Sequence, residues 1–493
     1  MIIGFLPLDS RPCTYDFPVQ LAKQAGAQVI LPPKGFIADY RDVSNTARNL
    51  QWLKEIAPQC DALVISAEQL LHGGLIPSRK ARMSADDQLA ILQEIERIKK
   101  ASPELQIFLS TVLMRTSIST LSEETRIWWE KVNVYSQLRY RVLTGADEKT
   151  QQQYDQLAQE IPQHVLESFL TAREVNHQIN RTCIQLVAKN VVDELLILQE
   201  DCAPEGIHWL EQRVLLDDIE KNRLNDRVFL FNGTDEAGAE LIQRALRPEG
   251  TSVEVVWLAS QTDFVAKYED RPFYLNLNGH MKALNMKQCQ GADSVLCILP
   301  PKMQQGEATQ PRIGNSCDYT TAELKQISEM IAELTKQGRH CYLLDLDFAN
   351  GGNTALLDTL GQCMPISQLW GYAAWNTASN SLGTLLAQIL ASRYNTAANQ
   401  AFTAERILDD GIYQTLVRSE VTKRLQEVGE DTYQISDTYR AEQYLMEAFC
   451  NRRQLLERIF GGKAPEFEVK LRWNRLFEAA VFVCGNGPIY QKS

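Results

Sequence analysis

Short apolar runs alternate with longer amphipathic segments, and this alternation restricts the fold more than any other feature of the chain. Over the first 118 residues the apolar runs are Ile2–Leu8, Gln28–Leu31, Ala62–Ser66 and Ile107–Met114. The segments between them space apolar residues three and four positions apart, as helices do, at Pro18–Ala25, Ser44–Ile56 and Ala85–Lys100. Strands that alternate with helices in this way predict a parallel sheet with crossover helices.

The alternation stops near residue 119 and resumes near residue 191. Residues 119–190 are polar and rich in Glu, Gln and Arg, so we expect a helical insertion that caps a cleft. Strand-like runs return at Glu194–Leu198, Arg227–Phe231, Ser252–Leu258, Ser294–Leu299 and Cys341–Leu346, and helical patterns follow from about residue 400. We therefore predict an α/β protein with Rossmann-like parallel sheets in two or three lobes. Its segments are an N-terminal α/β lobe (1–118), the helical insertion (119–190), a second α/β region with acidic turns (191–400) and a helical C-terminal region (401–493).

Composition narrows the class of protein. The 493 residues are 44% hydrophobic and 23% charged, which is ordinary for a globular chain with a large core. The net charge of −12 disfavours broad nucleic-acid binding, which needs a basic surface. Eleven cysteines, an odd number without a CxxC pair, favour reduced thiols over a disulfide framework. With neither a leader-like start nor an 18-residue apolar window, we expect a cytoplasmic protein without a membrane partner.

Polar turns follow nearly every predicted strand, and they carry the functional signal. In open parallel sheets, ligands bind beyond the carboxyl ends of the strands. Asp, Asn and Gly also dominate turns for backbone reasons, so a single turn is uninformative. The succession of turns predicts that they line one cleft. The candidate residues are Asp9, Arg11, Glu68, Arg79, Arg115, Asp201, Asp235, Glu236, Asp345, Asp347, Asn350, Trp375, Asn376 and Asn380.

Paired carboxylates are the strongest catalytic pattern among these turns. Asp201 and Asp235 lie 34 residues apart, about the length of one strand–helix–strand unit. If their strands are neighbours, the two side chains converge on one substrate, as glycoside hydrolysis requires. Glu236 can replace Asp235 in either role. The sequence does not choose between the retaining spacing of about 5–5.5 Å and the inverting spacing of about 6.5–9.5 Å.

The remaining candidates have binding roles, each with an alternative. Arginines at strand ends suit a carboxylate or phosphate group, and we expect Arg11, Arg79 and Arg115 to hold an anionic part of the substrate. Pairing of these arginines with the acids of the later turns, across the lobes, is the alternative. Trp375 suits stacking on a sugar face or core packing, and the nearby amides of Asn376 and Asn380 suit hydroxyl or acetamido groups.

A metal site is the main competing interpretation. Asp345 and Asp347 share one strand face, and with Asp201 and Asp235 they would offer oxygen ligands to Mg²⁺ or Mn²⁺. Zinc is disfavoured because the six histidines are dispersed without an HxH or HExxH motif. The sequence also lacks a P-loop, a GxGxxG turn after the first strand and a GxSxG elbow.

Several motifs together resemble a known bacterial family. They are PLDSRP (7–12), GGLIPSR (73–79), QEDCAPEG (199–206), NGTDEAG (232–238), DFANGGN (347–353) and WNTASNSLG (375–383). The chain resembles, over nearly its full length, the family catalogued as domain of unknown function 4127. The resemblance implies one full-length unit and points to the same turns without supplying a reaction. It also associates the chain with sugar uptake and amino-sugar catabolism, which favours a carbohydrate substrate.

We therefore expect a glycoside hydrolase that acts on a small, anionic or N-acetylated sugar through two carboxyl groups and without a cofactor. Asp201 is one expected acid/base, and Asp235 or Glu236 is the other. The first alternative is a hydrolase or isomerase of a small polar metabolite that depends on Mg²⁺ or Mn²⁺. The second alternative is a protein that binds a small molecule without turnover. Both alternatives stay open at this stage, as does the oligomeric state.

Overall fold

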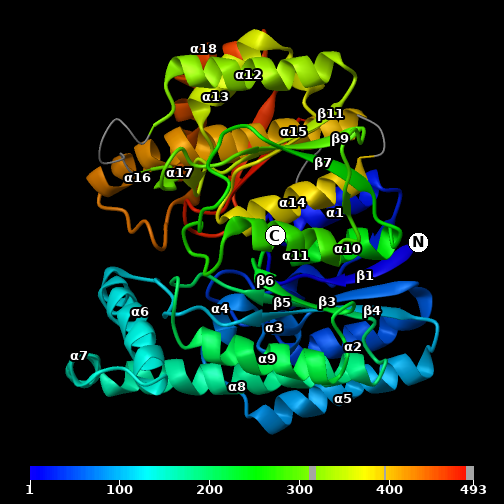
Figure 1. The fold of residues 1–493 in the computed structure, drawn as a ribbon, viewed down its shortest axis with the longest axis vertical. Helices are drawn as coiled ribbons and strands as arrows, with labels where there is room; N and C mark the ends of the chain where they lie inside the picture. The colour runs from blue at the N-terminus through cyan, green and yellow to red at the C-terminus, as the bar shows by residue number, and fades with distance from the viewer. Residues whose placement is uncertain (310–317, 393–395, 485–493) are drawn as a thin grey trace. The chain divides into compact units, whose positions relative to one another are not determined.

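The computed structural model describes residues 1–309, 318–392 and 396–484 (Figure 1). The chain forms two compact units. The first unit consists of residues 1–10, 26–246 and 268–271, and the second consists of residues 11–25, 247–267 and 272–493. The chain therefore enters the second unit after the first strand and returns to the first unit at residue 26. After residue 246 it enters the second unit again, and the short segment Tyr268–Arg271 belongs once more to the first unit.

The first unit is built on a six-stranded sheet in which all strand pairs are parallel. Its strands are β1 (Ile2–Leu6), β2 (Gln28–Ile30), β3 (Ala62–Ser66), β4 (Gln106–Leu113), β5 (Glu194–Gln199) and β6 (Val228–Asn232). They lie in the order β2-β1-β3-β4-β5-β6. The direction of the strand order reverses between β1 and β3, which is the switch point of a doubly wound sheet.

Helices cover both faces of this sheet, as Figure 1 shows for α5, α8 and α9 on one face and α10 on the other. The helices of this unit outside the insertion are α2 (Thr46–Ile56), α3 (Ala67–Leu71), α4 (Leu75–Ser78), α5 (Ala85–Ala101), α9 (His208–Lys221) and α10 (Ala237–Leu246), with short 3-10 turns at Lys34–Phe36 and Ala57–Gln59. Strands covered on both faces need apolar residues at every position. This explains why all five residues of β3 are buried.

The predicted insertion forms three helices: α6 (Glu123–Leu143), α7 (Glu148–Glu160) and α8 (Gln163–Ala188). The last of them is the crossover between β4 and β5 and contacts both strands. Helices α6 and α7 pack on each other and share a separate apolar cluster with α8, which includes Val132, Ile161 and Phe169. The segment is thus a crossover connection extended by a helical pair.

The second unit repeats the strand order of the first. Its parallel strands are β7 (Ser252–Trp257), β8 (Lys287–Gln288), β9 (Ser294–Leu299), β11 (His340–Asp345) and β13 (Gly371–Ala373). They lie in the order β8-β7-β9-β11-β13, which matches the order of β2, β1, β3, β4 and β5. A separate two-stranded pair joins β10 (Gly306–Glu307) and β12 (Phe348–Ala349). In both sheets, the direction in which successive strands are added therefore reverses between the first and third strands in chain order.

Side chains of β9 alternate between two apolar cores, one on each face of the second sheet. Val295, Cys297 and Leu299 belong to one core, and Leu296 and Ile298 belong to the other. Helices α12 (Thr321–Lys336) and α13 (Thr354–Cys363) cover the first face, and α11 (Phe273–Ala283) and α14 (Ala378–Ala391) cover the second (Figure 1). A 3-10 turn at Ile366–Gln368 precedes β13.

The C-terminal region is helical and ends in a hairpin. Its elements are α15 (Ala397–Arg406), the π-helix η5 (Ile407–Val417), α16 (Arg418–Glu427), α17 (Thr438–Cys450), α18 (Arg453–Ile459), β14 (Phe467–Leu471) and the antiparallel β15 (Ala479–Val483). Helix α1 (Asp16–Gln24) belongs to the same unit and packs against α14. A π-helix of this length is unusual and often marks a functional or strained place.

The predicted fold class is confirmed, because the protein is an α/β chain with two main parallel sheets and a long helical C-terminal region. The boundary between the units follows Leu246, inside the segment predicted as the second α/β region. Strands β8 and β13 were missed because two or three residues leave too short an apolar run. Among the described residues, no helix is both long and apolar enough to cross a membrane.

Candidate functional site

Two predicted acidic turns leave the first sheet side by side. Strands β5 and β6 are parallel neighbours, and their last residues, Gln199 and Asn232, face each other in register. The next residues, Glu200 and Asp201 on one strand and the turn from Gly233 on the other, therefore begin at the same edge. This adjacency was the condition for the predicted pairing of Asp201 with the second turn.

Glu200 is a buried anchor for two arginines of the first unit. Nε of Arg79 donates to Oε1 of Glu200 over 3.1 Å, and the backbone N–H of Arg115 donates to Oε2 over 3.1 Å. Burial raises the pKa of Glu200, but the positive charges of Arg79 and Arg115 outweigh it and hold the pKa below its ordinary value. Glu200 is therefore ionised at neutral pH. The sequence placed it in a candidate turn without assigning it a role.

Asp201 is the more accessible carboxyl of this turn. Its side chain forms an ion pair with Arg115 and is 34% exposed, whereas that of Glu200 is 4% exposed. The two arginines and two carboxylates balance in charge. Within the first unit, Arg79 forms an ion pair with Glu200 and Arg115 forms one with Asp201. Both arginines therefore have acidic partners, which is the alternative that the sequence left open for them.

Glu236 differs from both of these carboxyls because it is fully buried. The backbone N–H of Thr234 donates to its Oε2 over 2.9 Å, and its Oε1 has no hydrogen-bond partner among the described residues. Burial raises the pKa of Glu236 well above its ordinary value, and the nearby carboxyls of Glu240 and Asp235 raise it further. Burial therefore favours the protonated, neutral form of Glu236.

Gly233 makes room for this acid, and its replacement is testable. Its φ is 139°, which disfavours side chains, and a Cβ atom would overlap Oε1 of Glu236. We expect Gly233→Ala to lower the unfolding free energy by more than about 1 kcal/mol, measured by urea denaturation. Gly145→Ala is the matched control, because Gly145 also has positive φ but has open space around it. Equal losses in both variants would contradict a specific role for Gly233.

Two other candidates of the first unit, Asp9 and Glu68, are buried at the carboxyl edge of the sheet. Asp9 is buried beyond β1. Glu68 lies in the first turn of α3, where its Oε1 accepts from the backbone N–H of Val112 over 2.7 Å and from the Thr111 hydroxyl over 3.2 Å. Burial raises the pKa of Glu68 to about 7. These contacts tie α3 to β4, so Glu68 contributes to the scaffold of the edge.

A second acidic centre lies at the end of β11 in the second unit. Oδ2 of Asp345 accepts from the backbone N–H of Asn353 over 2.6 Å and from the Tyr372 hydroxyl over 3.2 Å, and Oδ1 accepts from the N–H of Asp347. Asp347 accepts from Nδ2 of Asn353 over 2.9 Å. Asp347 and Asn353 also line a cavity of about 410 Å³ with Tyr319 and other residues.

The buried carboxyl of Asp345 predicts a pH-dependent stability. Burial, with the charge of Asp347, raises its pKa from 3.8 to about 7. The folded chain keeps a proton that the unfolded chain releases, so the stability from this group falls as pH rises from about 4 to about 7. We expect Asp345→Asn to flatten that slope in urea unfolding at about pH 5 and about pH 8. The exposed Asp263→Asn is the control, and equal slopes in all three proteins would contradict the assignment.

The other candidates of the second unit lie at left-handed backbone positions, in the first turn of α14 or beside an aromatic ring. Asn350 and Asn376 have φ values of 60° and 63°, a conformation that asparagine tolerates better than most residues. Nδ2 of Asn350 also donates to Glu307 over 2.9 Å. The backbone N–H of Asn380 donates to the hydroxyl of Thr377, which caps α14, and the guanidinium of Arg11 lies 5.3 Å from the ring centre of Trp473.

Trp375 is buried and packs against Phe477, with ring centres 5.8 Å apart. Its indole N–H has no hydrogen-bond partner among the described residues. The fourteen predicted residues are thus divided between the units. Asp9, Glu68, Arg79, Arg115, Asp201, Asp235 and Glu236 belong to the first unit, and Arg11, Asp345, Asp347, Asn350, Trp375, Asn376 and Asn380 belong to the second.

Two clusters of polar side chains were not predicted from the sequence. The π-helix holds Asp409 and Asp410, both paired with Arg406. The spacing of three and four residues is a signal that could have indicated this pairing. In the first unit, Cys202, His208 and Asp270 converge in the buried interior. No sequence signal links Asp270 to the other two, because it comes from the distant segment Tyr268–Arg271.

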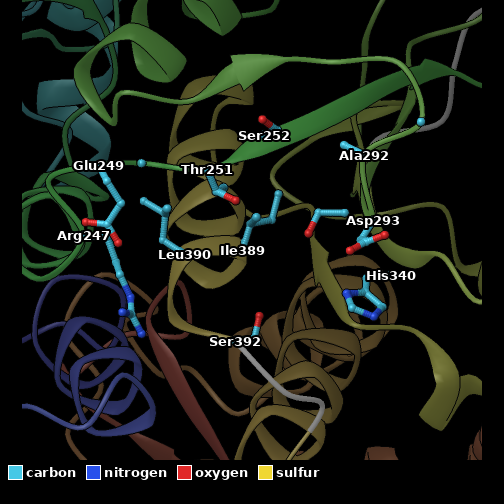
Figure 2. A pocket seen from close by; sticks show the side chains of 13 residues that line it. Arg247, Glu249, Thr251, Ser252, Ala292, Asp293, His340, Ile389, Leu390 and Ser392 are labelled. Carbon is cyan, nitrogen blue, oxygen red and sulfur yellow. The ribbon is translucent and has the colours of Figure 1, made fainter.

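A cavity of about 680 Å³ opens at the amino edge of the second sheet (Figure 2). Ser252, Ser294 and His340, the first residues of β7, β9 and β11, line it. Figure 2 shows Asp293 beside His340 on one side and Arg247 with Glu249 on the other. This edge is opposite to the one where ligands bind in open α/β sheets, so the cavity adds no support to the predicted turns.

Comparison with known proteins identifies the family. A family model described as "Protein of unknown function (DUF4127)" matches residues 3–481. The chain belongs to the DUF4127 family. The six motifs that suggested the resemblance all lie within the matched residues of this DUF4127 protein. No curated protein matches the DUF4127 chain.

Two structures of one domain are distant matches to the DUF4127 chain. The carboxyl transferase domain of Rhizobium etli pyruvate carboxylase with 3-bromopyruvate is 9% identical, with a TM-score of 0.21 over 92% of this chain and 60% of that one. The same domain with pyruvate is 10% identical, with a TM-score of 0.21 over 94% and 58%. The DUF4127 chain therefore spans about 60% of the length of these structures, and a likeness this low supports no functional argument.

Proposed function

We propose that this protein is a glycoside hydrolase that cleaves a small sugar substrate with two carboxyl groups of its first unit. Glu236 is the general acid, and Asp201 is the general base or nucleophile. One observation carries the proposal: neighbouring strands deliver an accessible Asp201 paired with Arg115 and a Glu236 with a strongly raised pKa to the same sheet edge. Carboxyls with opposed environments are the usual source of acid and base roles in one site.

Each carboxyl suits its proposed role. A general acid must hold a proton at the working pH, and burial keeps the pKa of Glu236 high. A base or nucleophile must reach its target, and Asp201 is the more exposed carboxyl of its turn. Glu200 positions Arg115, which in turn contacts Asp201. Asp235 directly precedes Glu236 in the second turn and is the alternative partner for Asp201.

The balance of charge favours an uncharged sugar. Arg79 and Arg115 face Glu200 and Asp201, so the four groups sum to zero. A phosphate on the substrate would need positive charge beyond this balance. We therefore narrow the expected anionic or N-acetylated sugar to a neutral one, with N-acetylated sugars included.

A screen of fluorogenic glycosides tests both the proposed glycoside hydrolysis and the preference for an uncharged sugar. We expect plain glycosides to be cleaved faster than the 6-phosphorylated forms, and cleavage to continue in EDTA. A preference for the phosphorylated forms would contradict the charge argument. Ligand-induced stabilisation without turnover of any glycoside would favour a binding protein instead.

The Mg²⁺- or Mn²⁺-dependent alternative has less support. Both oxygens of Asp345 already accept hydrogen bonds, from Asn353, Tyr372 and Asp347. Burial raises its pKa to about 7, so about half of this carboxyl is protonated near pH 7, and the protonated form is a poor ligand for a hard cation. Activity that disappears in EDTA and returns with Mg²⁺ alone would reinstate this alternative.

A further inference from the structure

Three side chains with different metal-ligand chemistry meet inside the first unit. The ligand atoms of Cys202, His208 and Asp270 all lie within 4.8 Å of one another, and all three residues are buried. Cys202 lies in the turn after β5, His208 begins α9, and Asp270 comes from the segment Tyr268–Arg271. Residues from three separate segments therefore converge on one point.

His208 is the member of the cluster whose polar atoms are least satisfied. The residue is fully buried, yet neither ring nitrogen has a hydrogen bond of good geometry with a described residue. Nε2 lies 3.3 Å from Oδ2 of Asp270, but the contact does not have the direction of a hydrogen bond. A buried polar group is almost always satisfied, so an unsatisfied imidazole beside a thiol and a carboxylate points to an unseen partner.

The second coordination shell of such a partner is already present. Oδ1 of Asp270 accepts from Nε of Arg271 over 2.9 Å, and Oδ2 accepts from Nε2 of Gln212 over 2.6 Å. Nδ2 of Asn232 donates to the sulfur of Cys202 over 3.6 Å. Hydrogen bonds of this kind orient ligands in metal sites.

We propose that Cys202, His208 and Asp270 form a binding site for a transition-metal cation of the Zn²⁺ class. Sulfur, imidazole nitrogen and carboxylate oxygen are the three ligand types that Zn²⁺ accepts, and a thiolate excludes Mg²⁺ and Ca²⁺. The bound cation ties the segment Tyr268–Arg271 to the end of β5. The backbone N–H of Cys202 already donates to the carbonyl of Tyr268 over 2.9 Å, which holds the segment close without the cation.

The site adjoins the proposed catalytic turn but does not depend on the proposed function. Cys202 directly follows Asp201 in the chain. We assign the cation a structural role, because its three ligands join the segment Tyr268–Arg271 to the turn after β5 and the start of α9. Glycoside cleavage can therefore fail while metal binding holds, and metal binding can fail while cleavage holds.

Cobalt titration of the full-length protein tests the site. Metal is removed with a chelator, and Co²⁺ is added while the thiolate-to-cobalt charge-transfer band is recorded. We expect one Co²⁺ per chain, a band that saturates at that ratio, and displacement of Co²⁺ by Zn²⁺. A wild-type protein that binds no cobalt, or binds it without the thiolate band, would overturn the proposal.

Variants assign the ligands. We expect Cys202→Ser to abolish the band, and His208→Asn to weaken cobalt binding by more than the roughly 10–100-fold that loss of an outer-shell partner costs. Cys183→Ser is the matched control, because Cys183 is also a buried cysteine of the same unit, and the band should persist in this variant. Circular dichroism verifies that each variant is folded. A band of unchanged strength in folded Cys202→Ser would overturn the assignment, as would its loss in folded Cys183→Ser.

Discussion

Glu236→Gln is expected to lower turnover of the cleaved glycoside by about 10²–10⁴-fold, the usual contribution of a general acid. Glutamine keeps the shape of the neutral acid but has no proton to give to the leaving group. Because burial favours the neutral form of the native carboxyl, we expect the unfolding free energy to change by less than about 1 kcal/mol. Steady-state kinetics and urea denaturation measure the two quantities on the same preparation.

Glu205→Gln is the matched control for this variant. Glu205 belongs to the turn after β5, and its side chain pairs with Arg141 at the surface. We expect its turnover to stay within about twofold of the wild type, because a surface ion pair contributes little. Normal activity in folded Glu236→Gln, or an equal loss in both variants, would remove Glu236 from the mechanism.

Arg406→Met is expected to lower the unfolding free energy by about 3–5 kcal/mol, because it leaves two buried carboxylates without their cation. Nη1 of Arg406 lies 3.0 Å from Oδ2 of Asp409 and 3.0 Å from Oδ1 of Asp410, and its guanidinium lies 3.6 Å from the ring centre of Phe17. All of these groups belong to the second unit. Urea denaturation of the full-length chain measures the loss.

The dependence on pH separates this explanation from simple loss of packing. Burial raises the pKa of Asp410 to about 7 even with Arg406 in place. Without the arginine, both carboxyls must take up protons to stay buried, so the variant loses stability as pH rises through neutrality. We expect the further changes Asp409→Asn and Asp410→Asn to restore much of the loss at about pH 8.

Arg453→Met is the control, since Arg453 pairs with Glu457 on the surface with its side chain 81% exposed. We expect it to cost less than about 0.5 kcal/mol. A loss in Arg406→Met that is independent of pH and unaffected by the asparagine changes would contradict the charge explanation.

The sheets were predictable because parallel strands buried on both faces read as apolar runs. Ala62–Ser66 and Ser294–Leu299 were predicted with the bounds that the structure shows. Strand β13 was not predicted, because its three residues form a strand through their pairing with β11, which lies far away in the sequence. The π-helix was also missed, since its hydrophobic spacing does not differ visibly from that of an α-helix.

The candidate site was predictable at the level of turns but not of side chains. Alternation along the strands located Glu200, Asp201 and Glu236 at one edge. The strand pattern did not show which acids Arg79 and Arg115 would pair with, because the pairing depends on which acidic side chain of the turn faces the interior. The cluster of Cys202, His208 and Asp270 could not be foreseen, since Asp270 reaches it from 62 residues beyond His208.

The leaving-group dependence of turnover tests the central claim most directly. A general acid is needed only when the departing group requires a proton. For Glu236→Gln we expect a large loss with glycosides of poorly leaving alcohols and a small loss with glycosides of strongly acidic phenols. Asp201→Asn should lose activity equally with both, because a base or nucleophile serves every leaving group. If Glu236→Gln instead shows the same loss across the series, Glu236 is not the proton donor and the proposed mechanism is wrong.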